Sequence, residues 1–320
     1  MTRPPHRATL ARRSVLRPCA AAAAAVALAA ALAACGGSQA EAFKPTRALA
    51  LGDELSFIDA GGRKYTINSL KTDGSLDCAA NPMWMQDVAG SFGLVFPECN
   101  PNAVTTTSRI VAAPGAKVAD LTTQIDGLVA AGGFTTKDLV TVLVGMHDVL
   151  EQYALYPATP EADLVKELEA RGKLLGAQLN RLSSLGAPVL ASTLPDLGKT
   201  PFAIAQEAAN PGRADLLTRL SHALDNGMRL EMVNDGRKIG LLFADIEVQN
   251  DVKYTGSLGF SNVTQAACLS TSPVPNCTTA TLQSGATATN WLWADQLLPS
   301  AGFHYRMGRL ARDRAHNNPF

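Results

Sequence analysis

The stretch Ala48-Leu49-Ala50-Leu51-Gly52-Asp53-Glu54-Leu55-Ser56 decides how this chain folds. Its first four residues form a short apolar run, and Gly52-Asp53 closes that run as a turn closes a buried strand. In an open α/β sheet, ligands collect beyond the carboxyl ends of the strands. Asp53 and Glu54 are therefore candidate site residues, and the alternative is that both are solvated residues of a turn.

Strand-like and helix-like segments alternate from this stretch to the end of the chain. Branched and apolar runs predict further strands at 139–144, 188–192 and 239–244. A helix start is expected within 81–89, and helical patterns cover 118–131, 164–182, 214–233 and 301–314. Residues 254–287 are rich in loop-forming residues. This alternation predicts a parallel sheet with helices on both faces, in one α/β domain at 45–320.

The N-terminus has the features of an export signal. Five arginines and no acidic residue accompany an unbroken run of small apolar residues that extends to Ala34. The run ends in Leu32-Ala33-Ala34-Cys35, which resembles the bacterial lipoprotein cleavage box. The resemblance implies a signal peptide at 1–34, lipidation of Cys35 and a short tether at 35–44. A transmembrane anchor is the alternative, but about fifteen apolar residues fall short of the roughly twenty that a bilayer needs.

Two further features concern the destination and the route of export. Gly36 after the cysteine resembles lipoproteins that are sorted to the outer membrane. We therefore expect a chain that is held by its lipid to the membrane of the cell envelope, with the outer membrane as its site. Arg12-Arg13 loosely resembles a twin-arginine signal, and an ordinary charged leader fits these residues equally well.

Removal of the leader makes the chain acidic. It takes away 5 of the 28 basic residues and leaves 23 against 28 acidic ones. A net charge near −5 without a basic patch speaks against nucleic acid as a partner. About 285 residues remain, which is enough for one well-buried domain.

The cysteines of the mature chain suit an oxidising compartment. They are an even set beside Cys35, namely Cys78, Cys99, Cys268 and Cys277, and four cysteines allow three pairings. We expect Cys78 to pair with Cys99 and Cys268 with Cys277, because each pair brackets a segment rich in Gly, Pro or Asn that could loop back. A zinc site is the alternative, but the spacings contain no Cys-x-x-Cys pair.

Four short blocks give the chain a family resemblance. In order, they are Gly52-Asp53-x-Leu55-Ser56, Gly115 within 113–116, Gly145-Met146-His147-Asp148, and Asp295-x-x-Leu298-Pro299-Ser300. Their order and spacing resemble the conserved blocks of the GDSL-type SGNH hydrolases, in the esterase and autotransporter branch of that family. The resemblance covers nearly all of the mature chain. It implies a flavodoxin-like three-layer α/β/α domain with a mainly parallel sheet.

In that family the blocks supply a serine nucleophile and the glycine and asparagine donors for the oxyanion. They also supply a histidine that acts as the base and an aspartate that orients this histidine. The positions that match in this chain are Asp53, Gly115, Asp148 and Asp295. Three other positions carry different groups. Glu54 stands at the nucleophile position, His147 at the asparagine position and Leu298 at the position of the catalytic histidine.

These replacements remove the usual chemistry. In a serine-protease example, loss of the nucleophile or of its base alone costs about a million-fold in rate. A leucine at position 298 cannot accept a proton at any pH. Ser56 and His304 are the candidates for replacing the lost groups, but Ser56 lies two positions too far along a tight turn. His304 lies where the family often has a second histidine, and a structural role fits it better.

The sequence leaves two classes of function open. The first is a non-catalytic lipoprotein of the SGNH fold that binds an acylated or glycan ligand, or an envelope partner, in the former active-site cleft. The second is an ester hydrolase that works through Glu54 and His147, which should face each other, although an acyl anhydride is a poor route to ester hydrolysis. A metal site built from Glu54, His147 and Asp295 is a third alternative. We favour the non-catalytic interpretation, with no cofactor and no metal.

Overall fold

The strand predicted at the opening stretch is the second strand of a five-stranded parallel sheet. This computed structural model describes residues 1–2, 42–318 and 320. The sheet order is β4-β1-β5-β6-β7, formed by Arg109–Ile110, Arg47–Gly52, Asp138–Leu143, Val189–Ser192 and Ile239–Leu242. Numbered by their place in the chain, these strands run 2-1-3-4-5, which is the flavodoxin-like order. All four neighbouring pairs are parallel.

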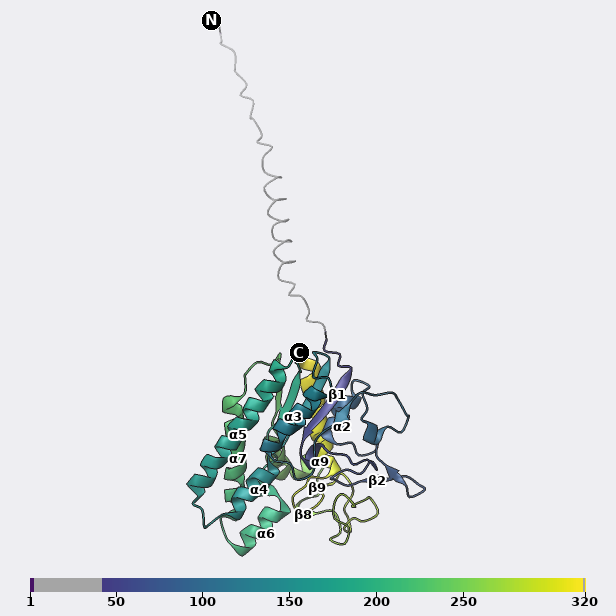
Figure 1. The fold of residues 1–320 in the computed structure, drawn as a ribbon, viewed down its shortest axis with the longest axis vertical. Coiled ribbons are helices and arrows are strands. Elements are labelled where there is room, and N and C mark those ends of the chain that lie inside the picture. The colour runs from purple at the N-terminus through teal and green to yellow at the C-terminus, as the bar shows by residue number, and fades with distance from the viewer. Residues whose placement is uncertain (3–41, 319) are drawn as a thin grey trace. The chain divides into compact units, whose positions relative to one another are not determined.

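Helices cover both faces of this sheet (Figure 1). On one face α5 (Glu161–Ser184) packs along α7 (Arg213–Glu231), with α3 (Leu121–Ala130) beside α5. On the other face α2 (Trp84–Gly90) packs against α9 (Ala301–Asn317). Three shorter helices lie near the carboxyl ends of the strands: α4 (Met146–Ala154), α6 (Pro201–Ala209) and α8 (Ala244–Lys253). The predicted three-layer α/β/α architecture is confirmed.

The remaining elements are short. β2 (Ser69–Leu70) pairs antiparallel with β3 (Leu76–Asp77), and β8 (Asn262–Ala266) pairs parallel with β9 (Trp291–Trp293). Single turns of 3-10 helix occur at η1 (Glu54–Ser56), η2 (Pro97–Cys99), η3 (Val118–Asp120), η4 (Leu197–Lys199) and η5 (Thr255–Leu258).

The segment 254–287, which the sequence predicts to be rich in loops, also contains the short elements η5 and β8. One predicted boundary is wrong in detail. The strand predicted at 239–244 ends at Leu242, because α8 already begins at Ala244. The sequence also did not predict α4, α6 or the two-residue β4 as separate elements. These elements are short, so tertiary contacts and not local periodicity decide them.

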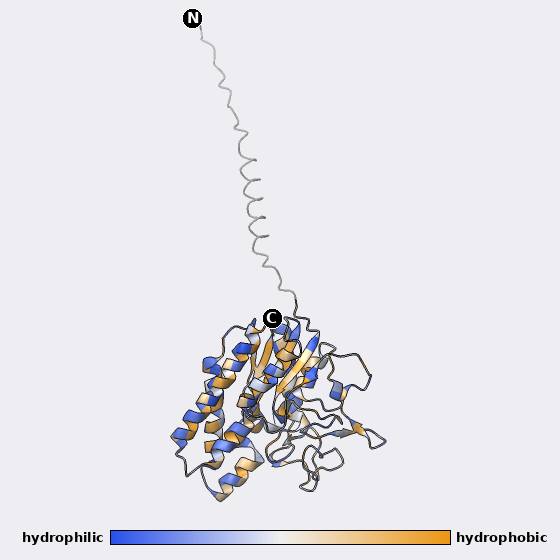
Figure 2. Cartoon of the chain, in the orientation of Figure 1, coloured by the Kyte–Doolittle hydropathy of each residue, from blue (hydrophilic) through white to orange (hydrophobic). Residues whose placement is uncertain are grey.

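The core lies on the two faces of the sheet. Every residue of β5 is buried, which explains its unbroken branched and apolar run. The leucine stripe of α5 is buried as its spacing predicts, at Leu164, Leu168, Leu175, Leu179 and Leu182. Figure 2 shows the hydrophobic colour on the central strands and the hydrophilic colour on the outer sides of the helices.

The two predicted disulfides are both present. Cys78 is bonded to Cys99, and Cys268 to Cys277, with Cα atoms 5.6 and 5.8 Å apart. Most of the predicted signal peptide, together with Cys35, lies outside the described residues. Among the described helices, none has both the length and the apolar composition needed to cross a bilayer.

Candidate functional site

A tight turn holds Glu54 at the carboxyl end of β1. Gly52 has φ +119°, and a Cβ atom there would lie 1.9 Å from the carbonyl oxygen of Leu143 on β5, so a side chain does not fit. Asp53 caps η1, because its Oδ1 accepts a hydrogen bond from the amide of Leu55 at 3.0 Å. Gly52 and Asp53 therefore determine the backbone position from which the side chain of Glu54 projects.

His147 reaches the same point from the neighbouring strand. It lies in the first turn of α4, two residues after Gly145, and β5 ends just before that glycine. The carboxyl ends of β1 and β5 meet where the strand order reverses, which is where open α/β sheets bind ligands. Nε2 of His147 lies 2.7 Å from Oε1 of Glu54. The predicted proximity of these two side chains is confirmed.

The second carboxylate oxygen of Glu54 is also occupied. Oε2 accepts a hydrogen bond from the backbone amide of Gly115 at 3.0 Å. In the SGNH scheme, Gly115 and the residue at position 147 are the places that supply donors to the oxyanion of the substrate. Both donors turn here to the protein's own carboxylate. Glu54 therefore lies between these two positions and contacts both.

Glu54 and His147 form a charged pair. Burial of Glu54 opposes its ionisation, but hydrogen bonds from His147 and from backbone amides outweigh this, so the pKa of Glu54 is lowered. The hydrogen bond to Glu54 is the main cause that raises the pKa of His147. The side chain of Glu54 is 8% exposed and that of His147 27% exposed, so the pair faces solvent on the histidine side.

Asp53 differs from Glu54 in its surroundings. It is fully buried, and within the described chain its Oδ2 has no hydrogen-bond partner. Burial and, after it, the charge of Glu54 raise the pKa of Asp53 well above its ordinary value. The neutral form of Asp53 is therefore favoured, and Glu54 carries the negative charge of this site.

Asp148 joins two of the four blocks. Its Oδ2 accepts a hydrogen bond from the amide of Val118 at 2.9 Å, and its Oδ1 one from Arg171 at 3.2 Å. The loop that carries Gly115 leads directly to Val118. Asp148 thus ties the end of that loop to the start of α4, so the two segments whose Gly115 and His147 contact Glu54 are held together.

The fourth block has a leucine, and no histidine, at position 298. Oδ1 of Asp295 accepts hydrogen bonds from the amides of Leu297 and Leu298, at 2.8 and 2.7 Å. The side chain of Leu298 is buried in the core. Burial raises the pKa of Asp295, and the charge of Glu54 raises it further. The carboxylate of Asp295 therefore stabilises the turn that follows it. Position 298 offers no imidazole for Asp295 to orient.

Neither Ser56 nor His304 replaces the lost groups. Both are fully buried, and within residues 42–318 and 320 neither the Ser56 hydroxyl nor the His304 ring nitrogens have a hydrogen-bond partner. Burial, together with the charge of Lys64, lowers the pKa of His304 to about 3. His304 is therefore a neutral core residue of α9, as its structural interpretation predicted.

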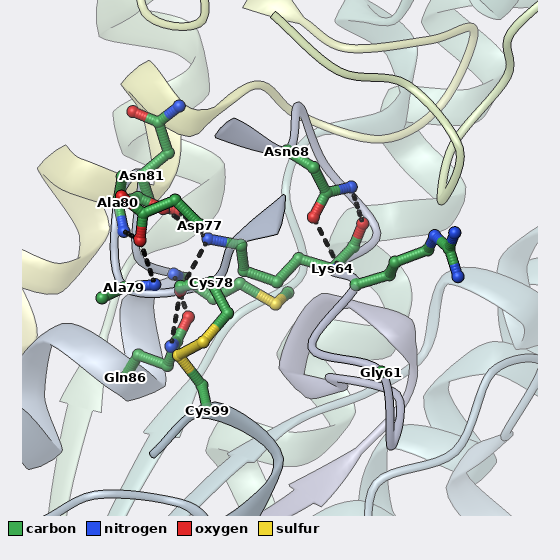
Figure 3. Close-up of a disulfide and its surroundings, with 12 residues drawn as sticks. Gly61, Lys64, Asn68, Asp77, Cys78, Ala79, Ala80, Asn81, Gln86 and Cys99 are labelled. Atoms are coloured by element: carbon green, nitrogen blue, oxygen red, sulfur yellow. Dashed lines mark hydrogen bonds between the residues drawn. A yellow bond between two sulfur atoms is a disulfide. The ribbon is translucent and has the colours of Figure 1, made fainter. Parts of the chain in front are cut away.

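Residues that the sequence did not point to support the site from the side of the first disulfide. Lys64 is fully buried, and Nζ donates hydrogen bonds to the carbonyl oxygens of Ala80 at 2.6 Å, Asn81 at 2.7 Å and Cys78 at 3.1 Å (Figure 3). Burial lowers the pKa of Lys64 to about 8. A lone lysine carries no sequence signal for such a role.

The three carbonyl groups that accept from Lys64, here called its carbonyl cage, belong to the segment just before α2, and Lys64 fixes that segment. Helix α2 in turn contacts the Glu54 turn. The indole nitrogen of Trp84, in the first turn of α2, donates a hydrogen bond to the carbonyl oxygen of Leu55 at 3.1 Å. Lys64 and Trp84 therefore hold the Glu54 turn in place from outside. In the part of the chain that the structure describes, no three His, Cys, Asp or Glu side chains form a group that could hold a metal ion.

Comparisons with known proteins gave matches among solved structures. No family model matches the chain, and no curated protein does. The acetyl xylan esterase AlAXEase is 12% identical, with 82% of this chain and 97% of that chain covered and a TM-score of 0.43. An acetylxylan esterase from Geobacillus stearothermophilus is 16% identical, with 85% and 96% covered and a TM-score of 0.43. A member of the lipolytic G-D-S-L family from Veillonella parvula is 10% identical, with 84% and 95% covered and a TM-score of 0.39.

The chain has the flavodoxin-like α/β/α architecture that the resemblance of its four blocks implied. The strand order 2-1-3-4-5 is the one expected. The first three blocks meet around Glu54, through the contacts of Gly115 and His147.

Proposed function

We propose that this chain is a non-catalytic member of the SGNH fold, a lipid-anchored envelope protein that binds a ligand or partner and does not hydrolyse an ester. The observation that carries the proposal is the placement of the Glu54 carboxylate between the Gly115 amide and His147. An ester carbonyl would have to displace a hydrogen-bonded, ionised side chain to reach these donors. Such a side chain disfavours binding of the reacting group and of its transition state alike.

Hydrolysis through Glu54 itself is disfavoured by the same contacts. A carboxylate attacks best when an oxygen lone pair is free, whereas both oxygens of Glu54 accept hydrogen bonds, which stabilise its negative charge and lower its nucleophilicity. The residue at position 298, where the family places its base, is an apolar core side chain. The site therefore has no activated nucleophile. It also has no base at position 298 that could activate a water molecule.

The proposed location depends on the leader. Residues Leu32-Ala33-Ala34-Cys35 support processing at Cys35 and attachment of lipid to it, and the pair of disulfides in the folded domain agrees with an oxidising compartment. Gly36 supports the outer membrane as the destination. We propose a domain that is held at the membrane through the tether at 35–44 and that binds an acylated or glycan ligand or a partner in the envelope.

An ester assay tests the proposal directly. Purified soluble protein that begins after Cys35 is incubated with a chromogenic short-chain ester, with and without a divalent metal. We expect no turnover above that of the Glu54→Ala variant under either condition. A clear rate that Glu54→Ala abolishes would support instead an ester hydrolase that acts through Glu54 and His147, and a rate that appears only with metal would support a metal-assisted one.

A further inference from the structure

A groove lies beside the Asp295 turn, since the next residue, Gln296, is part of its lining. It has a volume of about 610 Å³, within the roughly 300–1,000 Å³ of small-molecule sites. One wall is helix α6, and the other is formed by β8, by the start of β9 and by the loop that joins them. Figure 1 shows α6, β8 and β9 together at the edge of the domain where the strands end.

The lining of this groove has no charge. Eleven residues line it, and none of them has an ionisable side chain, although 18% of the chain is charged. Three glutamine amides and two hydroxyls supply its polar groups, at Gln265, Gln283, Gln296, Thr264 and Ser284. Amides and hydroxyls both donate and accept hydrogen bonds. A charged ligand would lose its water here without gaining an opposite charge.

Trp291 supplies a flat apolar surface in the same groove. The other two tryptophans are fully buried, and their indole nitrogens donate to carbonyl oxygens of the core. Trp291 is partly exposed and lines the groove instead. An aromatic ring beside amides and hydroxyls suits a ligand with an apolar C–H face and a rim of neutral hydroxyls. This is the chemistry of a sugar ring.

The walls of the groove are held in place before any ligand arrives. The backbone amide of Phe202 on α6 donates to the carbonyl oxygen of Gln296 at 2.9 Å, and the amide of Gln283 donates to the carbonyl oxygen of Ala267 at 2.7 Å. The disulfide between Cys268 and Cys277 closes the loop next to β8. A site whose backbone is fixed in this way loses less entropy when it binds.

We infer that this groove binds a neutral oligosaccharide, with a sugar ring on Trp291 and its hydroxyls on the surrounding amides. The side-chain amide of Gln265 is already oriented by a hydrogen bond within the protein. Its Oε1 accepts a hydrogen bond from Asn262 at 2.7 Å, which orients the amide and leaves its NH₂ group to donate elsewhere. The inference deepens the proposed binding function by naming the ligand class and the place. It does not require Glu54 to be inactive.

Titration with defined sugars tests the inference. The mature domain, with both disulfides intact, is titrated with cellohexaose, maltohexaose, xylohexaose and chitohexaose, followed by calorimetry and by tryptophan fluorescence. We expect at least one of these neutral sugars to bind and to shift the fluorescence of Trp291. Hexagalacturonate, which is anionic, should bind more weakly than the best neutral sugar. If no neutral sugar binds, or if the anionic one binds best, the inference is wrong.

Substitutions locate the binding. Trp291→Ala should weaken the best sugar about ten-fold or more, in keeping with the loss of about 1.4 kcal/mol of aromatic contact. Trp291→Phe, which keeps a ring, should retain part of the affinity and guards against a folding defect. Tyr305→Ala removes an exposed aromatic that does not line the groove and should have no effect. Equal affinity in Trp291→Ala and wild type would place the sugar elsewhere and refute the inference.

The two proposals can fail separately. An active ester hydrolase with a sugar-binding groove would contradict the proposed function and leave the groove intact. A protein that neither hydrolyses esters nor binds neutral sugars would contradict the groove alone. The ester assay reports on Glu54, and the sugar titration on Trp291.

Discussion

Oε1 of Glu54 lies 2.7 Å from Nε2 of His147, although the two residues are 93 positions apart in the chain. β1 and β5 bring them together, since the two strands pair in parallel and end at the same edge of the sheet. Because Glu54 is a carboxylate, Nε2 of His147 carries the proton of this hydrogen bond. The pair joins the start of η1, just after β1, to the first turn of α4.

The first prediction concerns the titration of His147. Its pKa should lie above the 6.5 of a free histidine, since Glu54 stabilises the charged ring. Glu54→Gln should lower this pKa toward or below the free value. NMR of the imidazole signals measures both values, and Asp148→Asn, which removes a more distant charge, should change the pKa less. A normal or depressed pKa in the wild type would contradict the ion pair.

The same shifts set the pH window in which the pair stabilises the fold. The raised pKa of His147 gives stability that is fully present below pH 6.5 and is lost as the pH rises through the folded value. The lowered pKa of Glu54 gives stability that is present above pH 4.5 and is lost as the pH falls through the folded value. The difference in unfolding free energy between wild type and Glu54→Gln should therefore be largest between about pH 4.5 and 6.5.

The second prediction is that Glu54→Ala leaves an anion site that a small carboxylate refills. The Gly115 amide and His147 lose their acceptor in this variant. Acetate should bind there and raise the pKa of His147 again, as Glu54 does in the wild type. NMR titration with sodium acetate, compared with sodium chloride at equal ionic strength, separates specific binding from screening. The wild type is the matched control and should not respond, because its own carboxylate fills the site.

How far the sequence predicts this molecule depends on how local each signal is. The strands β1 and β5, the long helix α5 and the four blocks could be predicted, because a buried strand, a leucine stripe and a motif each show in a few consecutive residues. The pairing of Glu54 with His147 followed from the parallel sheet. That the amide of Gly115 would donate to Glu54 did not follow, since it depends on where a loop turns.

The roles of Lys64 and Trp291 could not be predicted for a related reason. Lys64 is a charged residue inside the fold, held by three carbonyl oxygens from a segment 14 to 17 residues further on. Sequence patterns place lysine at the surface as a rule. Trp291 lines its groove only because α6 and the β8–β9 pair come together in space.

The third prediction concerns the two disulfides. Cys78 and Cys99 close a loop of 21 residues and Cys268 and Cys277 one of 9. In the chain-entropy model, each should contribute about 3 kcal/mol, with the longer loop worth about 0.8 kcal/mol more. Urea unfolding of the Cys78→Ser/Cys99→Ser and Cys268→Ser/Cys277→Ser variants measures both contributions. Loss of the Cys78–Cys99 bond should also disturb the nearby carbonyl cage of Lys64. A smaller loss of stability there than at Cys268–Cys277 would contradict both the loop-length effect and the coupling to Lys64.

The fourth prediction concerns the anchor. Cys35→Ser should yield a protein without lipid that is released from the membrane fraction, because the cysteine sulfur is the atom that carries the lipid in the lipoprotein class. The matched control is Ser38→Ala, which leaves the cleavage box intact and should stay membrane-bound. Intact-mass spectrometry of the wild-type mature protein reads out the acyl groups. A mature wild-type mass without them would show that the lipoprotein interpretation is wrong.

The last prediction is that catalysis can be restored on this scaffold. Glu54→Ser removes the carboxylate that fills the anion site, and Leu298→His places an imidazole three residues after Asp295, at the family's base position. The double variant should hydrolyse a chromogenic acetate ester measurably faster than wild type, and about 100-fold or more faster than Glu54→Ser alone, which lacks a base. Adding His147→Asn should raise the rate further, by supplying the amide donor of the family. Leu298 is buried, so circular dichroism and thermal unfolding of each variant must first show a native fold. If the folded double variant is slower than wild type, the wild-type residues are themselves catalytic and the non-catalytic interpretation of the site fails.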